Sequence, residues 1–261
     1  MKCKLILGYF PRKKWGTKVF SAVRGFSFLV LPLLVTAEIP CTGAEKGWPE
    51  RELVVGCGDE QAVASSTGSQ WQNVPTGDRK LWEVSQFGGE GEVEFSAESI
   101  VMEAGDPLTG VRCLVDMPRE NFEIELQSRR LTNFDFFCGL TFPVGEGKCS
   151  LILGGWAGSV VGLSSIDGVD AARNQTKKLM HFDNERWYRV RVQVTPAMVT
   201  CWVDDEKVVE QARGDHKFDI RVEMDASSPL GVAAFQCRSE IRQFRWRKLP
   251  AVEQEKGDDG E

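Results

Sequence analysis

The sequence has few histidines and no long apolar run. His181 and His216 are the only histidines among 261 residues, which excludes a metal centre built from several of them. The longest apolar stretch, residues 26–35, is about half the 20 residues or so that a membrane-spanning helix needs. No CxxC pair occurs among the eight cysteines, and neither a phosphate-binding loop nor a dinucleotide-binding motif is present. A zinc ribbon, a thioredoxin-like site and a nucleotide-binding fold are therefore not expected.

Charge is distributed unevenly along the chain. The formal net charge is −6, which argues against nucleic acid as a partner. Residues 1–44 nevertheless hold seven basic residues and a single acidic one, Glu38. The basic stretch is followed by the short apolar run and then by small residues at 42–44, the pattern of a signal peptide. We predict cleavage near residue 44, with residues 36–37 as a second option and an uncleaved membrane anchor as the alternative.

Composition divides the remaining chain into three parts. Residues 45–79 are polar and rich in turn formers, which predicts a linker or a loosely ordered lead-in. Residues 80–250 show strand patterns almost throughout and are enough for one domain with a proper core. Residues 251–261 are acidic and poor in apolar side chains, which is typical of a disordered tail. After signal cleavage we expect no membrane span and a periplasmic or extracellular protein.

Alternation of apolar and polar residues predicts an all-β domain. A short helix is expected only within residues 171–180. About ten strands at this spacing favour a two-sheet antiparallel sandwich of the jelly-roll type. The clearest strand segments are 92–96, 121–127, 136–142, 150–153, 187–194, 199–204, 231–236 and 240–246. Cys138 and Cys149 flank one predicted hairpin and are the candidate disulfide pair.

The hairpin over residues 187–204 predicts which side chains share a face. With the turn centred at Pro196–Ala197, Val192 lies opposite Cys201 and Arg191 opposite Trp202. The valines then form a buried face, and Arg189, Arg191 and Trp202 lie on the other one. In the segment 121–127, a similar polar face carries Glu123, Glu125 and Gln127. An indole beside fixed polar groups suits a sugar, and a solvated face with arginine stacked on tryptophan is the alternative.

Several longer motifs resemble a known family. They are Asp135–Val144, Cys149–Gly158, Gly162–Gly168, Trp187–Val192, Pro229–Gly231 and Ile241–Trp246. The resemblance covers roughly residues 80–250 and is to the 3-keto-disaccharide hydrolase domain family, in a branch common among exported planctomycete proteins. It implies a concanavalin A-like sandwich and cleavage of sugars that are oxidised at C3.

Such chemistry needs a general base and an acid for the leaving oxygen. The candidate catalytic residues are Glu123, Glu125 and Glu223. An exposed strand face, and for Glu223 an ion pair with Arg221, are the alternatives.

The candidate sugar-binding residues are Trp156, Gln127, Asn174, Arg189, Arg191 and Trp202. Trp156 lies in a glycine-rich loop that lets the backbone approach a ligand closely, and packing beneath a tight turn is the alternative. Asp167 and Asp170, with Asn174 nearby, could ligate Ca²⁺, and simple turn formation is the alternative. We therefore expect an exported protein that cleaves or binds a modified glycoside. A non-catalytic lectin-like module and a structural envelope protein are the alternatives.

Overall fold

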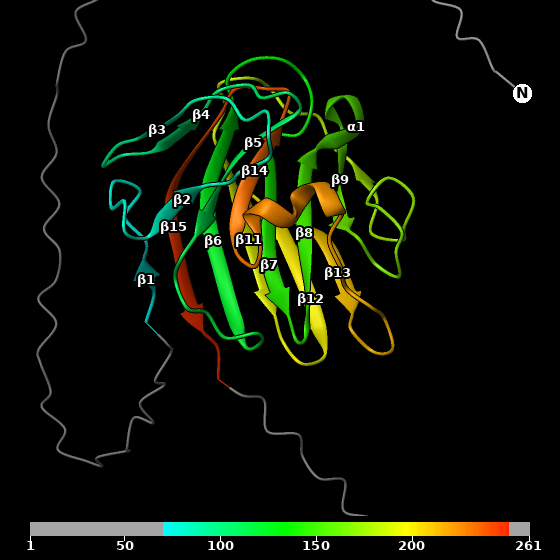
Figure 1. Cartoon of the computed structure of the whole chain (residues 1–261). Coiled ribbons are helices and arrows are strands. Elements are labelled where there is room, and N and C mark those ends of the chain that lie inside the picture. The colour runs from blue at the N-terminus through cyan, green and yellow to red at the C-terminus, as the bar shows by residue number, and fades with distance from the viewer. Residues whose placement is uncertain (1–69, 251–261) are drawn as a thin grey trace, which may run out of the picture. The chain divides into compact units, whose positions relative to one another are not determined.

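The structure is a computed structural model and describes residues 70–250 (Figure 1). The predicted signal peptide, most of the lead-in and the acidic tail lie outside these residues. The described part is a sandwich of two antiparallel sheets, which confirms the all-β prediction. Within residues 70–250, no helix has both the length and the apolar character to cross a membrane.

Sheet A is the eight-stranded layer. Its order is β13-β12-β11-β6-β15-β4-β3, with β1 paired to β15 beside β4. The strands are β1 (Gln72–Asn73), β3 (Val93–Phe95), β4 (Ile100–Met102), β6 (Phe122–Arg130), β11 (Tyr188–Val194), β12 (Met198–Val203), β13 (Glu206–Ala212) and β15 (Ser239–Lys248).

Sheet B is the seven-stranded layer, ordered β10-β9-β8-β7-β14-β5-β2. Two short helical segments flank it, α1 (Gly155–Gly158) and the 3₁₀ helix η1 (Val222–Ser227). The strands are β2 (Trp82–Val84), β5 (Leu108–Cys113), β7 (Cys138–Val144), β8 (Gly147–Gly154), β9 (Val160–Ser164), β10 (Lys178–Leu179) and β14 (Gly231–Phe235).

The predicted register of the β11–β12 hairpin is confirmed. Val192 pairs with Cys201, and Arg191 pairs with Trp202. Val190, Val192 and Val194 are fully buried because they point between the sheets. In β6 the predicted inward residues Phe122, Ile124 and Leu126 are likewise fully buried.

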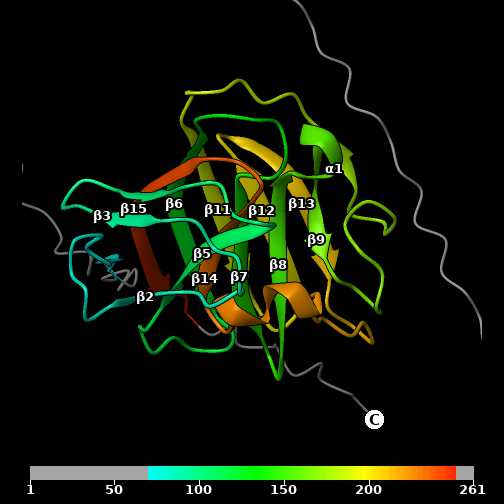
Figure 2. The same cartoon turned by 45° about the horizontal axis from the view of Figure 1, so that its top comes forward.

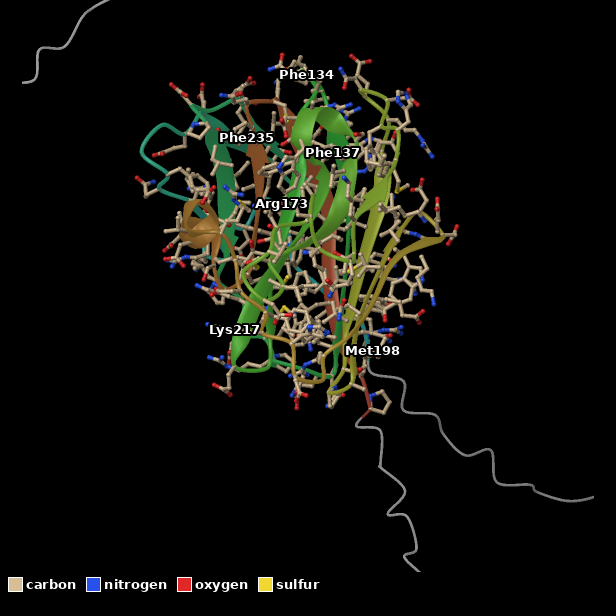
Figure 3. All side chains as sticks on the ribbon, turned by 90° about the vertical axis from the view of Figure 1, so that its right-hand side faces the viewer. Phe134, Phe137, Arg173, Met198, Lys217 and Phe235 are labelled. Atoms are coloured by element: carbon tan, nitrogen blue, oxygen red, sulfur yellow. The ribbon has the colours of Figure 1, made fainter. Side chains whose placement is uncertain are left out.

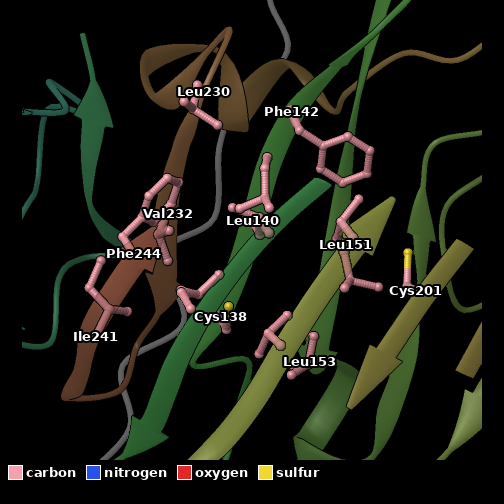
Figure 4. Close-up of a cluster of buried hydrophobic side chains, with 14 of the residues drawn as sticks. Cys138, Leu140, Phe142, Leu151, Leu153, Cys201, Leu230, Val232, Ile241 and Phe244 are labelled. Carbon is pink, nitrogen blue, oxygen red and sulfur yellow. The ribbon is translucent and has the colours of Figure 1, made fainter. Parts of the chain in front are cut away.

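The core fills the layer between the two sheets (Figure 4). Leu140, Leu151 and Val232 of sheet B enter the same layer as Cys201 and Ile241 of sheet A. Interdigitation of two inner faces is the usual way in which a sandwich is stabilised. Full burial of each large aliphatic side chain contributes about 1.5–3 kcal/mol.

Sheet B is covered on its outer face as well. The helix η1 crosses the outside of β14, β7 and β8 in both views of the ribbon (Figures 1 and 2). Met224 of η1 is buried against Leu108 and Ala233, which both lie on that outer face. Every residue of β7 is therefore buried, and the strand shows no alternation.

Three local features differ from the expectations. Residues 70–79, within the predicted lead-in, contain β1 and the buried Val74, so the sandwich already includes them. The expected helix over residues 171–180 is wrong, because this stretch forms turns and then β10. Polar turn formers such as Asp170 and Asn174 bond to nearby backbone there.

The predicted Cys138–Cys149 disulfide is also wrong. Both cysteines are buried and free. In the β7–β8 register Cys138 lies opposite Leu153, whereas Cys149 lies opposite Phe142. The two cysteines therefore sit four positions apart along the hairpin, about 13 Å at the rise of a strand. That separation is beyond the reach of a disulfide.

Candidate functional site

A pocket with a volume of about 200 Å³ lies on the outer face of sheet B. Ser150 and Ile152 of β8 reach this face because they alternate with Leu151 and Leu153, which point into the core. The lining comes from six separate segments of the chain. It consists of Leu108, Asp135, Phe136, Ser150, Ile152, Trp156, Ser164, Arg221, Glu223, Met224 and Phe235.

The floor of the pocket is apolar. One cluster joins Leu108 and Met224 with the partly buried Phe136 and Phe235. A second cluster is built around Ile152, and Phe136 packs against it too. The Phe136 and Phe235 rings are 5.7 Å apart between centroids, at 34°. Phe136 thus connects the two clusters beneath the pocket.

Gly139 has no side chain, and the space that this leaves is taken by side chains of the floor. A Cβ added at Gly139 would lie 3.0 Å from Met224 Cε and 3.1 Å from Phe136 Cε2. Gly139 pairs with Ile152 on the neighbouring strand. Any larger residue at 139 would therefore push two lining side chains outward.

Trp156 stands on a tight left-handed turn. Gly154, Trp156, Ala157 and Gly158 all have positive φ, and Trp156 as a whole residue is 40% exposed. Asp135 supports this turn, because its Oδ2 accepts a hydrogen bond from Ala157 N at 3.3 Å. Its Oδ1 accepts one from Phe136 N at 2.7 Å. One carboxylate thus fixes the backbone at Phe136 and next to Trp156, two of the three aromatic residues of the lining.

An ion pair lies at the mouth of the pocket. Arg221 Nε donates to Glu223 Oε1 at 2.7 Å, and Arg221 Nη1 lies 3.8 Å from Asp170 Oδ2. The side chains of Arg221 and Glu223 remain 45% and 40% exposed. Desolvation acts to raise the pKa of Glu223, but the backbone N–H and Arg221 outweigh it, and the pKa is lowered. Glu223 is therefore an anion at neutral pH.

The two serines of the lining have buried hydroxyl groups. Ser150 Oγ is 2.8 Å from Thr141 Oγ1, within hydrogen-bond distance. Ser164 Oγ is buried and has no hydrogen-bond partner among the described residues. Polar groups that a ligand can reach are therefore concentrated at the mouth of the pocket.

Six of the predicted site residues lie on the outer face of sheet A, and Glu123 is one of them. The core separates this face from the pocket, and arginines hold its carboxylates. Glu123 is almost fully buried and bonds both Arg191, at 3.2 Å, and Arg247, at 2.8 Å. The Arg191 guanidinium covers the Trp202 ring.

The other members of this face have similar partners. Glu125 accepts from Arg245 at 2.6 Å, and Gln127 accepts from Arg242 at 2.8 Å. Arg189 forms an ion pair with Asp205. These contacts form a polar layer in which arginines hold every named carboxylate, and the arginines outnumber the carboxylates.

Asn174 and the two candidate calcium ligands are engaged in loops. Asn174 Nδ2 donates to the carbonyls of Leu163 and Val169. Asp170 bonds Arg173 at 2.7 Å, and Asp167 lies 2.7 Å from His216 Nδ1. Within residues 70–250, no three His, Cys, Asp or Glu side chains gather as a metal site. Calcium binding at Asp167 and Asp170 stays a prediction.

Of the predicted site residues, the pocket brings together Trp156 and Glu223. Sequence reasoning did not select Asp135, Phe136, Ile152, Met224 or Phe235. One signal could have located them. The strands over 138–144 and 150–153 are apolar or small on both faces, which indicates cover outside sheet B.

Comparison with solved structures finds carbohydrate-active sandwiches at low identity. The carbohydrate-binding module CBM66 from Bacillus subtilis is 11% identical, with a TM-score of 0.44, over 67% of this chain and 97% of that chain. The Bacillus licheniformis beta-glucanase is 8% identical, with a TM-score of 0.46, over 71% and 100%. Domain 4 of a Geobacillus stearothermophilus extracellular arabinanase, solved with arabinotriose, is 12% identical, with a TM-score of 0.43, over 67% and 87%.

The family assignment rests on sequence. No curated protein matches the chain. A family model for 3-keto-alpha-glucoside-1,2-lyase-like domains matches residues 97–249, which is more than half of the chain. This match confirms the family resemblance of the motifs at 135–144, 149–158 and 241–246. The chain belongs to the family of 3-keto-alpha-glucoside-1,2-lyase-like domains.

Proposed function

We propose that the pocket on sheet B binds a glycoside, with the sugar ring at its mouth. The observation that carries this proposal is the exposed indole of Trp156 at the same pocket as the Arg221–Glu223 ion pair. An indole covers the C–H face of a sugar, and charged groups are strong partners for its hydroxyls. Arg221 donates and Glu223 accepts, so together they suit neighbouring hydroxyl groups.

The side chains of the pocket favour binding over bond cleavage. Glu223 is ionised and paired with Arg221, so it has no proton to give to a leaving oxygen at neutral pH. Both oxygens of Asp135 already accept backbone hydrogen bonds. The two histidines of the chain, His181 and His216, are outside the lining. An ionised Glu223 meets the requirement for a base, but the lining offers no side chain placed as an acid for the leaving oxygen, so a lectin-like role fits better than a hydrolase or lyase.

Calorimetric titration tests the proposal. Because the family is lyase-like, the ligands are 3-keto-glucosides and their unoxidised parents. We expect Trp156→Ala to weaken binding at least tenfold, whereas the matched variant Trp202→Ala on sheet A binds like the natural protein. Chromatography of the same mixtures reports cleavage. Equal affinity for Trp156→Ala, or rapid release of free sugar, would overturn the proposal.

We also propose that the protein is exported. The support is the basic and then apolar pattern of residues 1–44. Protein recovered from the cell envelope should begin after residue 36 and before residue 46. N-terminal sequencing that finds Met1 on this material would contradict export by cleavage.

A further inference from the structure

We infer that the ligand is a glycoside with an apolar aglycone, such as an aryl group, and that this aglycone occupies the floor of the pocket. The inference rests on the proposed function, because it assumes that a sugar binds at the mouth. It adds the chemical class of the second half of the ligand and the direction in which the ligand enters.

The first argument is the shortage of polar partners on the floor. A sugar ring carries several hydroxyl groups, and each one that is buried without a partner costs about 1–3 kcal/mol. The two hydroxyls beneath the pocket, Ser150 Oγ and Ser164 Oγ, are both buried. The remaining floor is formed by Leu108, Ile152 and Met224 with the two phenylalanines. A second sugar ring in this position would lose hydrogen bonds to water and gain few in return.

The second argument is the gradient of exposure from the mouth to the floor. At the mouth, Trp156 as a residue is 40% exposed, and the side chains of Arg221 and Glu223 are 45% and 40% exposed. Ile152 and Met224 are only 4% and 3% exposed. A polar group at the mouth and an apolar group inside match this gradient.

The third argument is the shape of the floor. Phe136 and Phe235 are partly buried, and their rings are tilted by 34° at 5.7 Å. Aromatic rings pack favourably on such pairs at centroid distances of about 4.5–7 Å. The enclosed volume of the pocket is about 200 Å³, which is below the range of about 300–1,000 Å³ that is usual for sites that bury a whole drug-sized ligand. A cavity of that size holds one aromatic ring, so the sugar ring stays at the open mouth.

Titration of the full chain with a matched ligand set tests the inference. The ligands are the methyl and phenyl glucosides in both anomeric forms, their 3-keto derivatives, and phenol. We compare the two glucosides in whichever anomeric form binds more tightly. In that form we expect the phenyl glucoside to bind about tenfold or more tightly than the methyl glucoside, because only the phenyl group buries a large apolar surface. Phenol alone should bind weakly.

Two variants locate the aglycone. Phe235→Ser should reduce the preference for the phenyl glucoside over the methyl glucoside severalfold. Circular dichroism checks that this variant folds. If it does not fold, Ile152→Ser is the second variant of the floor. Trp156→Ala should instead weaken phenyl and methyl glucosides by the same factor.

The outcomes separate the two claims. Equal binding of methyl and phenyl glucosides overturns the aglycone inference and leaves the proposed function intact. Unchanged preference in both floor variants also overturns the inference. Binding of phenol without any preference for its glucosides overturns the proposed function. If no member of the set binds, both fail.

Discussion

Arg191 lies directly across β11 and β12 from Trp202, with its guanidinium carbon 4.0 Å from the centre of the indole ring. This contact covers a ring that would otherwise face water. We predict that Trp202→Ala lowers the free energy of unfolding by about 1–2 kcal/mol, through loss of apolar cover and of the cation–π contact. Glycoside affinity should not change. Urea unfolding and calorimetry measure the two effects, and a loss of affinity with intact stability would place the sugar site on sheet A.

Glu123 connects two arginines beneath that polar face. Its carboxylate is almost completely buried between Arg191 and Arg247, which are about one-third exposed. Glu123→Gln removes the negative charge and should lower the free energy of unfolding by about 1.5–3 kcal/mol. The matched control Glu94→Gln, at an exposed position of β3, should change it by less than about 0.5 kcal/mol. Similar values for the two variants in urea unfolding would show that Glu123 contributes no buried ion pair.

Asp170 provides a stability contribution that depends on pH. The hydrogen bond and charge of Arg173 lower the pKa of this carboxyl group in the folded protein. Its contribution is therefore present above its unfolded-state pKa of about 3.9 and is lost as the pH falls through the folded-state pKa. Asp170→Asn should cost about 1 kcal/mol at pH 7, because Arg173 is mostly exposed.

The difference in melting temperature between Asp170→Asn and the natural protein should shrink as the pH falls below 4. Thermal unfolding at several pH values measures it. A difference that is constant from pH 7 to pH 2.5 would contradict the ion pair as its cause.

The buried cysteines should be unreactive while the protein is folded. Desolvation raises the pKa of Cys113 to about 11 and the pKa values of Cys138, Cys149 and Cys237 to about 12. The pKa of Cys201 is raised for the same reason. Thiolate is then scarce at pH 8, and iodoacetamide should label these five only after unfolding. Peptide mass spectrometry reads each site, and fast labelling of Cys138 in the folded protein would show that β7 is not buried.

Much of the sandwich can be predicted from sequence, because half-buried strands alternate. The segment 188–203 shows this directly, since Val192 and Arg191 each lie opposite the residue expected from the turn. The same argument identified the polar face that carries Glu123. It could not predict that arginines from β15, such as Arg247, pair with the carboxylates of that face, because the pairing of β15 with β6 is not encoded locally.

The pocket is harder to predict for a physical reason. Its floor residues, such as Ile152 and Phe235, are apolar and therefore look like core residues in the sequence. They reach the pocket only because η1 covers the outside of sheet B and Met224 closes one side. Figure 3 shows Phe235 toward the same end of the sandwich as Phe134, with Met198 and Lys217 at the opposite end. Such an arrangement depends on the whole fold and on no single motif.

A crystal structure of the protein with bound phenyl glucoside, or with its 3-keto derivative, tests the central claim most directly. The account predicts density for the sugar against Trp156, within hydrogen-bond distance of Arg221 or Glu223, and density for the phenyl ring between Ile152 and Phe235. Density against Trp202 on the outer face of sheet A, with an empty pocket on sheet B, would contradict it.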